Sequence, residues 1–492
     1  MFMSDWKPII GLEIHAELLT KSKMFSGCPV VDSVEAAPNT AVDPVSLGLP
    51  GTLPVINRQA VEFGLMVGLA LHCEIPPVNQ FARKNYFYPD LPKGYQISQY
   101  ERPLAVNGWL DIEVTPPDGE PYQKRIRIRR AHLEEDTGKL THVGGGSSLV
   151  DYNRAGVPLL EIVTEPDINS ADEAEAFART LRAILQYLGV NNGDMSKGVL
   201  RVEPNISVMH KDDAEFRTRT EIKNLNSIRS LYRASLAEIE RQINLWQSGG
   251  EVKQATLGWD ENKQRLVIQR YKERADEYRY FPEPDLPVVE ISREWVEEVR
   301  ARLPELPEAK RRRFMETFGL SEYDARQLVA EQAIAHYYEE TLSAGVNPKS
   351  AANWILGGLF ALMNEKGFER ENIESTRITA RQFAELVKLV DAGTLNKGTA
   401  AAVLAEMWDT GSDPALIVAA RGLAQVSDQD IIRQAVANVL AENSAMAQDY
   451  LSGKEKLFGA LMGQVMKAMG GKANAQVVTD ILKQQLEAMR SS

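Results

Sequence analysis

The stretch I-G-L-E-I-H-A-E-L at residues 10–18 shows the pattern that predicts β-structure in the N-terminal part of the chain. Apolar residues occupy every second position, and polar residues fill most of the positions between them. A period of two predicts a strand with one buried face and one polar face. Because alternate side chains of a strand point to the same side, we expect Glu13, His15 and Glu17 to lie on one face.

The same kind of pattern continues to about residue 290, with many turn-forming residues between short alternating stretches. Further strands are expected at residues 125–129 and 201–208. Two helices interrupt this β-rich part. The first follows the capping-box pair Ser170 and Glu173 and should stop at Gly189. The second should begin near Ser227 and end at Gly249.

A proline-rich joint, residues 282–307, separates this part from a region in which almost every segment has helical periodicity. Apolar stripes at helical spacing lie in residues 383–390, 431–440 and 458–466, and we interpret the last, methionine-containing stripe as core. The sequence therefore predicts an α+β protein: a mixed α/β body over residues 1–292, a helical domain over 293–405 and a small helical tail over 406–492.

The composition is that of an ordinary globular protein and excludes a mostly disordered chain. The 492 residues include 56 basic and 68 acidic side chains, which gives a net charge of −12, and 44% are hydrophobic. No apolar run approaches the roughly 20 residues that would span a bilayer, and no secretory signal is evident, so we expect a cytoplasmic protein. The acidic balance argues against the usual basic kind of nucleic-acid protein but leaves room for a local basic surface.

Several common chemical motifs are absent. The chain has no Walker-type phosphate loop, no G-x-G-x-x-G fingerprint and no G-x-S-x-G elbow. Its two cysteines, Cys28 and Cys73, are too few for a disulfide framework or a four-cysteine zinc site. If the protein binds a nucleotide, it does so without a common phosphate loop, and if its reaction needs ammonia or an acyl intermediate, no motif here supplies one.

Three acid-bearing stretches predict a divalent metal site. Glu13 and His15 share a strand face, His132 and three successive carboxylates fall in residues 131–140, and Glu161 lies inside the apolar run 157–163. A buried carboxylate is costly unless it is paired or bound to a metal. Oxygen ligands with one histidine favour Mg²⁺ or Mn²⁺. Taken singly, the first two stretches also fit a solvated polar surface, and Glu161 also fits a buried pair with Arg154.

A segment of alternating basic and tyrosine residues, 81–100, is typical of a surface that meets phosphates and bases. It fits a loop packed on the body equally well. Polar residues at strand or turn positions occur in two more stretches, 201–208 and 220–227.

The motifs taken together resemble the B-subunit family of the bacterial tRNA-dependent amidotransferases. They are G-L-E-I-H-A-E-L (11–18), R-K-N-Y-F-Y-P-D-L-P-K-G-Y-Q-I-S-Q-Y (83–100), H-L-E-E-D-T-G-K (132–139), D-Y-N-R-A-G-V-P-L-L-E-I-V-T-E-P-D (151–167), E-I-K-N-L-N-S (221–227) and D-E-Y-R-Y-F-P-E-P-D (276–285). The resemblance extends over the whole chain.

The resemblance implies a cradle-shaped catalytic body that uses ATP and Mg²⁺. ATP would convert the side-chain carboxylate of misacylated Glu-tRNA(Gln), Asp-tRNA(Asn) or both into an acyl phosphate, and ammonia would then displace phosphate. It also implies a heterotrimer, in which the amidase (glutaminase) subunit releases ammonia from glutamine and a small third subunit joins the other two. The tail would be a YqeY-like domain that binds tRNA.

The resemblance also assigns residues. Those implied as catalytic are Glu13, His15, Glu135 and Glu161, and those implied as Mg²⁺ ligands are Glu13, His15, Glu134, Glu135 and Glu161. Those implied at the nucleotide and the aminoacyl end are Lys84, Tyr86, Arg154, Glu203, Asn205, Lys223 and Asn224. From residue 453 on, the tail contains six basic and three acidic residues, so this part of the chain is basic. We expect tRNA contacts from Lys454, Lys456, Lys467 and Lys472.

One departure from the family concerns zinc. Many members carry four cysteines in a zinc knuckle, and the matching positions here are Ser26, Cys28, Asp43 and Ser46. Since one thiol remains of four, we do not expect a structural zinc ion.

Two other classes of function remain open from the sequence. A non-catalytic tRNA-binding scaffold would not need the acidic strands, and a stand-alone metal-dependent hydrolase would act without a partner or tRNA. The intact acidic strands argue against the scaffold, and the lack of a nucleophile or zinc motif argues against the hydrolase.

Overall fold

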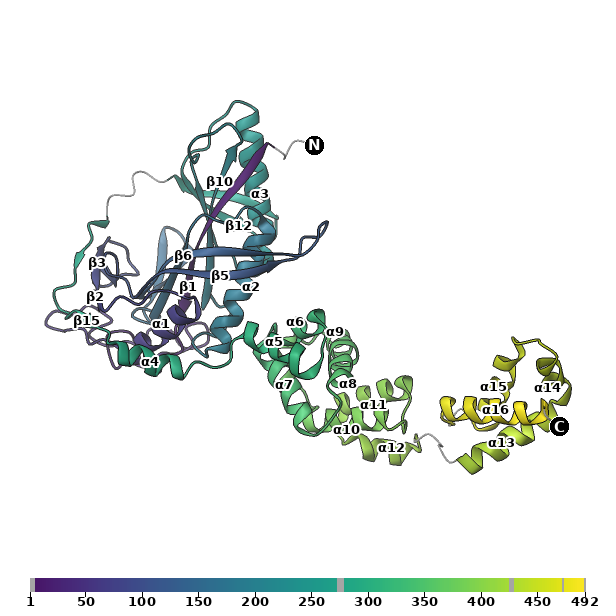
Figure 1. The fold of residues 1–492 in the computed structure, drawn as a ribbon. Helices are drawn as coiled ribbons and strands as arrows, with labels where there is room; N and C mark the ends of the chain where they lie inside the picture. The colour runs from purple at the N-terminus through teal and green to yellow at the C-terminus, as the bar shows by residue number, and fades with distance from the viewer. Residues whose placement is uncertain (1–4, 272–277, 424–428, 471–472, 491–492) are drawn as a thin grey trace. The chain divides into compact units, whose positions relative to one another are not determined.

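The computed structural model describes residues 5–271, 278–423, 429–470 and 473–490. It divides into two compact units, Met1–Leu306, which we call the body, and Pro307–Ser492. The body is built on an eight-stranded sheet with the strand order β13-β12-β11-β10-β1-β9-β6-β5 (Figure 1). Neighbouring strands are antiparallel except β11 and β12. The strands are β1 Trp6–Glu17, β5 Ala105–Val114, β6 Tyr122–Glu135, β9 Pro158–Thr164, β10 Leu200–His210, β11 Thr220–Lys223, β12 Ala255–Asp260 and β13 Arg265–Tyr271.

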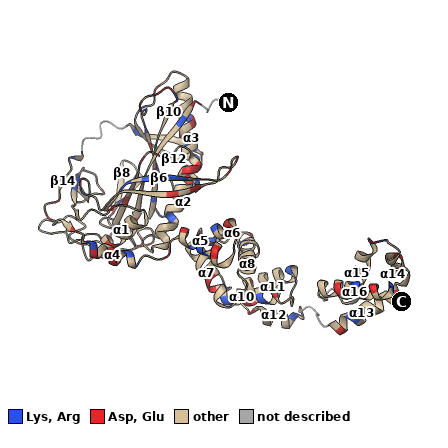
Figure 2. Ribbon diagram, viewed as in Figure 1, with Lys and Arg blue, Asp and Glu red and all other residues tan. Residues whose placement is uncertain are grey.

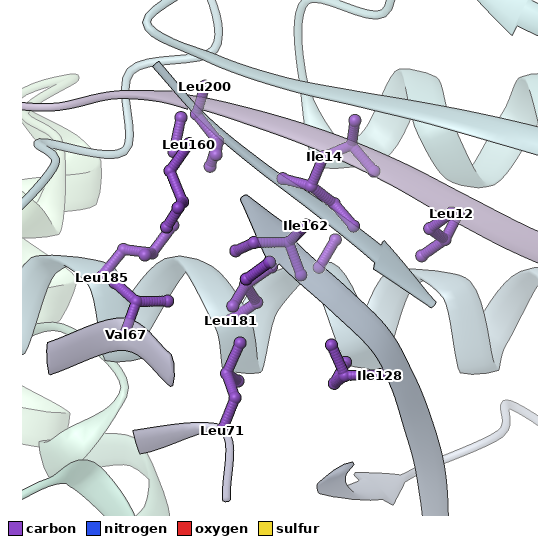
Figure 3. Packing of buried hydrophobic residues seen from close by; sticks show 14 of the residues in the cluster. Leu12, Ile14, Val67, Leu71, Ile128, Leu160, Ile162, Leu181, Leu185 and Leu200 are labelled. Carbon is purple, nitrogen blue, oxygen red and sulfur yellow. The ribbon is translucent and has the colours of Figure 1, made fainter. Parts of the chain in front are cut away.

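One face of the sheet is apolar and is covered by helices α1 (Arg58–Ala70), α2 (Ala171–Tyr187) and α3 (Ile228–Gln247). Leu12 and Ile14 of β1 point into this core, as the alternation predicted (Figure 3). The polar residues of β1 consequently line the opposite face, which we call the polar face.

Both predicted helices of the body are confirmed. The Ser170 hydroxyl caps α2 by accepting the Glu173 N–H, whereas the Glu173 carboxylate accepts the N–H of Asn169 rather than that of Ser170. Ser227 caps α3 in the same way. Gly189 and Gly249, just past the two helices, have φ angles of +66° and +77°, a conformation that favours glycine.

Strand β6 contains a bulge that decides where its polar residues point. Ile128 is paired with Thr164 and Arg130 with Val163, so two steps along β6 match one step along β9. Before the bulge, Ile126 and Ile128 are buried in the core, and after it Ala131 and Leu133 are. The extra residue thereby turns Arg130, His132 and Glu134 onto the polar face.

Smaller elements complete the body. A three-stranded sheet, β14-β3-β4, lies beside the polar face, where β4 contacts β6. These elements are β3 Ala82–Asn85, β4 Tyr95–Ser98, β14 Phe281–Pro282, the pair β2 Val78–Asn79 and β15 Val289–Glu290, the hairpin β7 Lys139–Gly144 and β8 Ser147–Asp151, and helix α4 Arg293–Ala301.

The second unit is helical. Its helices are α5 Pro307–Phe318, α6 Glu322–Val329, α7 Gln332–Ser343, α8 Pro348–Asn353, the π-helix Trp354–Leu359, α9 Phe360–Glu365, the 3₁₀ helix Arg370–Ser375, α10 Ala380–Asp391, α11 Lys397–Thr410, α12 Pro414–Arg421, α13 Gln429–Glu442, α14 Ser444–Leu451, α15 Leu457–Ala468 and α16 Ala475–Arg490. The predicted α+β class is thus confirmed. No helix among the described residues has the length and apolar character needed to cross a membrane.

The last four helices, α13–α16, share a hydrophobic core of their own. The methionine-containing stripe contributes Leu461 and Val465 to this core, with Met462 and Met466 packed at its edge, as predicted. Ile431, placed on the stripe by its spacing, is instead 53% exposed, because the buried face of α13 is centred on Ile432 and Val436.

Candidate active site

The polar face brings a histidine and two glutamates of three strands together. His15 of β1 lies directly opposite Glu161 of β9, and its Nε2 is 3.3 Å from the Glu161 carboxylate and 3.7 Å from that of Glu134 on β6. The ligand atoms of these three residues lie within 4.8 Å of one another. We call His15, Glu134 and Glu161 the histidine–carboxylate cluster. Three of the residues that the sequence predicted as ligands therefore meet at one point.

His132 completes this arrangement, although it was not among the predicted ligands. It is the β6 partner of Glu161, and its Nε2 lies 3.6 Å from the Glu161 carboxylate and 3.8 Å from that of Glu134. Its Nδ1 is buried and has no hydrogen-bond partner among the described residues. The sequence did carry a signal for it, since His132 and Glu134 are two residues apart in one strand.

Positive and polar groups keep the two carboxylates charged. Burial opposes ionisation of Glu161, but His132, His15 and Lys84 together hold its pKa well below the usual range. Burial also opposes ionisation of Glu134, and His132 and Lys84 nonetheless lower its pKa. Ser98 of β4 donates a hydrogen bond of 3.0 Å to Glu134. The cluster is therefore an anionic site within a largely buried surface.

A second acidic group lies along the same face. Glu13, Glu203 and Glu221, on β1, β10 and β11, also have carboxylate oxygens within 4.8 Å of one another, and we call them the triple-glutamate cluster. Burial, with Glu161 and Glu221 nearby, raises the pKa of Glu13. The predicted residues Asn205 and Lys223 belong here: Asn205 donates to Glu13 at 3.3 Å, and Lys223 donates to Glu203 at 2.7 Å.

Lys84 and Tyr86 border the histidine–carboxylate cluster, and their contact with the nucleotide and the aminoacyl end stays a prediction. Lys84 is on β3, and its Nζ lies 5.1 Å from the Tyr278 ring centre and 5.9 Å from that of Tyr86. Burial alone would lower the pKa of Lys84, but Glu134 and Glu161 raise it above the ordinary value. Among the described residues, no hydrogen bond or ion pair engages this ammonium group.

Glu135 and Arg154 are not brought into either cluster. Glu135 follows Glu134 in β6, and its carboxylate accepts hydrogen bonds of 2.6 Å from Lys93 and 2.9 Å from Ile97 N instead of joining a cluster. Arg154 donates to the carbonyls of Thr137 and Gly138 and lies 3.6 Å from Asp136. The sequence alternative in which Arg154 neutralises Glu161 is therefore not the arrangement found.

Other predicted residues lie away from both clusters or outside the described chain. Asn224 follows β11, is exposed and has a φ angle of +62°. In the tail, Lys454, Lys456 and Lys467 are exposed, and Lys454 forms an ion pair of 3.0 Å with Asp449. Lys472 lies outside the described residues.

The donor set of the histidine–carboxylate cluster fits Mg²⁺. Mg²⁺ prefers oxygen ligands and keeps several waters, so two carboxylates and one imidazole are enough to hold it. The carboxylates of Glu134 and Glu161 lie close together and repel one another, and a divalent cation between them would offset this repulsion. Glu161 in particular has no lysine or arginine within ion-pair distance among the described residues.

The four zinc-knuckle positions do not fit a zinc ion. Asp43 accepts hydrogen bonds from the N–H of Ser46, at 2.8 Å, and from the hydroxyls of Ser46 and Ser26. The fully buried ammonium group of Lys23 lies beside them and donates to the carbonyl of Ala41 at 2.8 Å. One thiol, one carboxylate already held by hydrogen bonds and two hydroxyls, with a cation beside them, make a poor zinc site.

Comparison with known proteins agrees with the resemblance seen in the motifs. Residues 8–297 match the GatB/GatE catalytic domain family and residues 336–486 match the GatB domain family. The B subunit of the aspartyl/glutamyl-tRNA(Asn/Gln) amidotransferase of Caldicellulosiruptor saccharolyticus is 49% identical over 484 residues, which cover 98% of this chain and 99% of the relative. The B subunits of Moorella thermoacetica and Herpetosiphon aurantiacus are 50% and 48% identical, each over at least 97% of this chain and 98% of the relative. The chain therefore belongs to the B-subunit family of the aspartyl/glutamyl-tRNA(Asn/Gln) amidotransferases.

Proposed function

We propose that the body uses ATP to activate the side-chain carboxylate of misacylated Glu-tRNA(Gln), Asp-tRNA(Asn) or both, and that ammonia then displaces phosphate to form the amide. A carboxylate is a poor electrophile, and phosphorylation supplies a leaving group. The observation that carries this proposal is the histidine–carboxylate cluster, in which His15, Glu134 and Glu161 meet on the polar face.

The residues of the chain have distinct tasks in this proposal. The histidine–carboxylate cluster would hold one Mg²⁺, and the triple-glutamate cluster offers a second place for a divalent cation. Bound Mg²⁺ neutralises charge on the transferring phosphoryl group. Lys84 adds a positive charge beside the cluster, and the rings of Tyr86 and Tyr278 flank its ammonium group.

Ammonia must come from elsewhere, because the chain has no recognisable glutaminase nucleophile motif. The relatives are B subunits by name, which supports a multi-subunit complex. We infer that an amidase subunit, which releases ammonia from glutamine, and a small third subunit form a heterotrimer with this chain. Amidation of misacylated tRNA is a step of protein biosynthesis, and a cytoplasmic location agrees with this role.

The tail provides the proposed contacts with tRNA outside the acceptor end. Basic and acidic side chains both occur on α13–α16 (Figure 2). Lys456 and Lys467 are exposed on this part of the chain and are available to phosphates. Contacts of this kind should weaken as salt is raised.

The test compares a charge-removing substitution in the cluster with a matched one outside it. The complex is assembled with Glu161→Gln or with Glu165→Gln, a nearby β9-end residue that pairs with Arg129 at 2.8 Å. Amidation of each mischarged tRNA and tRNA-dependent ATP hydrolysis are measured, with glutamine and with ammonium chloride. We expect Glu161→Gln to lower both rates at least about a hundredfold and Glu165→Gln to leave them unchanged.

Near-normal amidation by a folded Glu161→Gln complex would remove Glu161 from the chemistry and favour the scaffold function. Turnover of ATP without tRNA or partner subunits would favour the stand-alone hydrolase. Failure of Glu161→Gln to fold would indicate that this carboxylate is structural.

A further inference from the structure

Strand β6 carries four arginines, and one of them differs from the rest. Three of them, Arg125, Arg127 and Arg129, each form a bidentate ion pair with one carboxylate, with N–O distances of 2.7 to 2.9 Å. Arg130 has no hydrogen bond or ion pair among the described residues, and its Nε is buried without an acceptor. Buried donors of native proteins nearly always have a partner, so this one points to an acceptor that a ligand brings.

The position of Arg130 ties it to the histidine–carboxylate cluster. The bulge of β6 places it on the polar face, two residues before His132 and four before Glu134. Arg130 also lies near Tyr280, whose ring stacks on the Tyr100 ring that the guanidinium group contacts, and the same charged groups act on the Tyr280 hydroxyl. Burial raises its pKa to about 12, Glu134 and Glu161 act in the same direction, and Lys84 and Arg130 act against them.

Aromatic rings hold the Arg130 side chain in place without using its N–H groups. Its Cζ lies 5.7 Å from the centre of the Tyr100 ring, and Tyr100 stacks on Tyr280 with 4.2 Å between ring centres and 9° between planes. A guanidinium group over a ring face is held by a cation–π interaction. Lys84 is held in a similar way over Tyr278. Among the described residues, neither Lys84 nor Arg130 forms an ion pair with a carboxylate. Both border the histidine–carboxylate cluster, whose ligands fit a divalent cation.

This pattern suits an incoming phosphate. The carboxylates near Arg130 are engaged by His15, His132 and Ser98, so the described residues leave the guanidinium group available. A planar guanidinium group matches two oxygens of a phosphate better than an ammonium group does. Lys84 and Arg130, together with a bound divalent cation, would then neutralise the charge of the phosphate.

We propose that Arg130 is a phosphate-binding residue of the active site and donates two hydrogen bonds to a phosphate group of the substrate. This assignment rests on the proposed function and names a contact within the same site. The phosphate belongs either to ATP or to the 3′-terminal nucleotides of the tRNA, which present the same chemistry.

The experiment uses the assembled complex with ammonium chloride as nitrogen donor, so that glutaminase activity does not limit the rate. Arg130→Gln and Arg130→Lys are compared with wild type and with Arg129→Gln, which removes a neighbouring exposed arginine. The KM for ATP, the KM for mischarged tRNA and kcat are measured. We expect Arg130→Gln to raise one KM by at least about tenfold, as loss of a charge-assisted hydrogen bond does.

The two sources of phosphate give different results. A rise in the KM for ATP alone identifies the nucleotide, and a rise in the KM for tRNA alone identifies the tRNA end. Arg130→Lys keeps the charge but loses the planar fork, so we expect a smaller rise of about threefold or more in the same KM. Arg129→Gln should change neither constant.

The assignment is overturned if Arg130→Gln leaves both KM values within twofold of those of Arg129→Gln, whatever happens to kcat. If Arg130→Gln does not fold, wild-type KM values in Arg130→Lys overturn it instead. The proposed function is tested separately. Loss of ATP turnover in Glu161→Gln with unchanged constants in both Arg130 variants would reject the Arg130 assignment alone.

Discussion

Glu161 shows how far a single residue can be interpreted from sequence. Its apolar neighbours predicted a buried carboxylate that needs a partner, and the structure agrees. The apolar run itself left its partner open between a metal site and Arg154, whereas the structure places His15 and His132 beside it. Cross-strand neighbours depend on strand order, and residue spacing along one strand does not reveal that order.

A second residue, Glu17, predicts how the stability of the protein depends on pH. Burial, with Asp136 beside it, raises its pKa from 4.5 to about 8. Between these values the folded protein holds a proton that the unfolded chain has released, so the free energy of unfolding falls as pH rises across this window. Glu17→Gln cannot ionise, and its Tm should match wild type near pH 5 and exceed it by about 2 °C or more at pH 8.

The control is Glu101→Gln at an exposed position, which should follow the wild-type pH profile. A Tm difference between Glu17→Gln and wild type that stays constant from pH 5 to pH 8 would show that Glu17 does not carry this proton.

At the scale of the element, strand β6 marks the limit of what alternation predicts. The isoleucines at 126 and 128 correctly indicated a strand with a core face. Continued without interruption, the same period would turn His132 and Glu134 into the core. The bulge after Ile128 reverses the facing and sends both to the polar face. Alternation therefore predicts a strand well, but a one-residue bulge leaves no clear signal in the sequence.

The segment that carries the zinc-knuckle positions, residues 26–46, predicts how the protein responds to removal of metal. Because Asp43 is held by Ser46 and Ser26, we expect the loop to be stable without metal. A strong chelator should leave the Tm of the wild-type protein unchanged. Asp43→Ala removes the shared acceptor, and we expect it to cost about 1–3 kcal/mol of the free energy of unfolding, measured in denaturant.

Asp118→Ala, at an exposed position, serves as the matched control and should have wild-type stability. If the chelator lowers the Tm of wild type, or if zinc co-purifies in equal amount with the protein, the loop is a metal site after all.

At the scale of the whole molecule, the sequence predicted the change from a β-rich body to a helical region, and the structure divides between Leu306 and Pro307. The tail was expected to begin at residue 406, which lies inside α11, so its separable part is α13–α16, which carries Lys454, Lys456 and Lys467. Helices α13–α16 share their own core, and α12 packs on α10 and α11. A chain that ends after Leu423 should therefore keep the rest of its fold.

We expect a complex with this truncated chain to have a higher KM for tRNA, with a weaker dependence on salt, while glutamine hydrolysis remains. Filter binding of tRNA at several salt concentrations measures the effect directly. Equal affinity and an equal salt slope for truncated and intact complexes would show that the tail makes no phosphate contacts.

The central claim is that His15, Glu134 and Glu161 hold a divalent cation, and direct titration of the assembled complex with Mn²⁺, followed by electron paramagnetic resonance, tests it most directly. We expect tight binding by wild type and by Glu165→Gln, and a loss of affinity of at least about tenfold in Glu161→Gln. Mn²⁺ binding by Glu161→Gln that is as tight as in wild type, in a complex that folds and assembles normally, would contradict the claim.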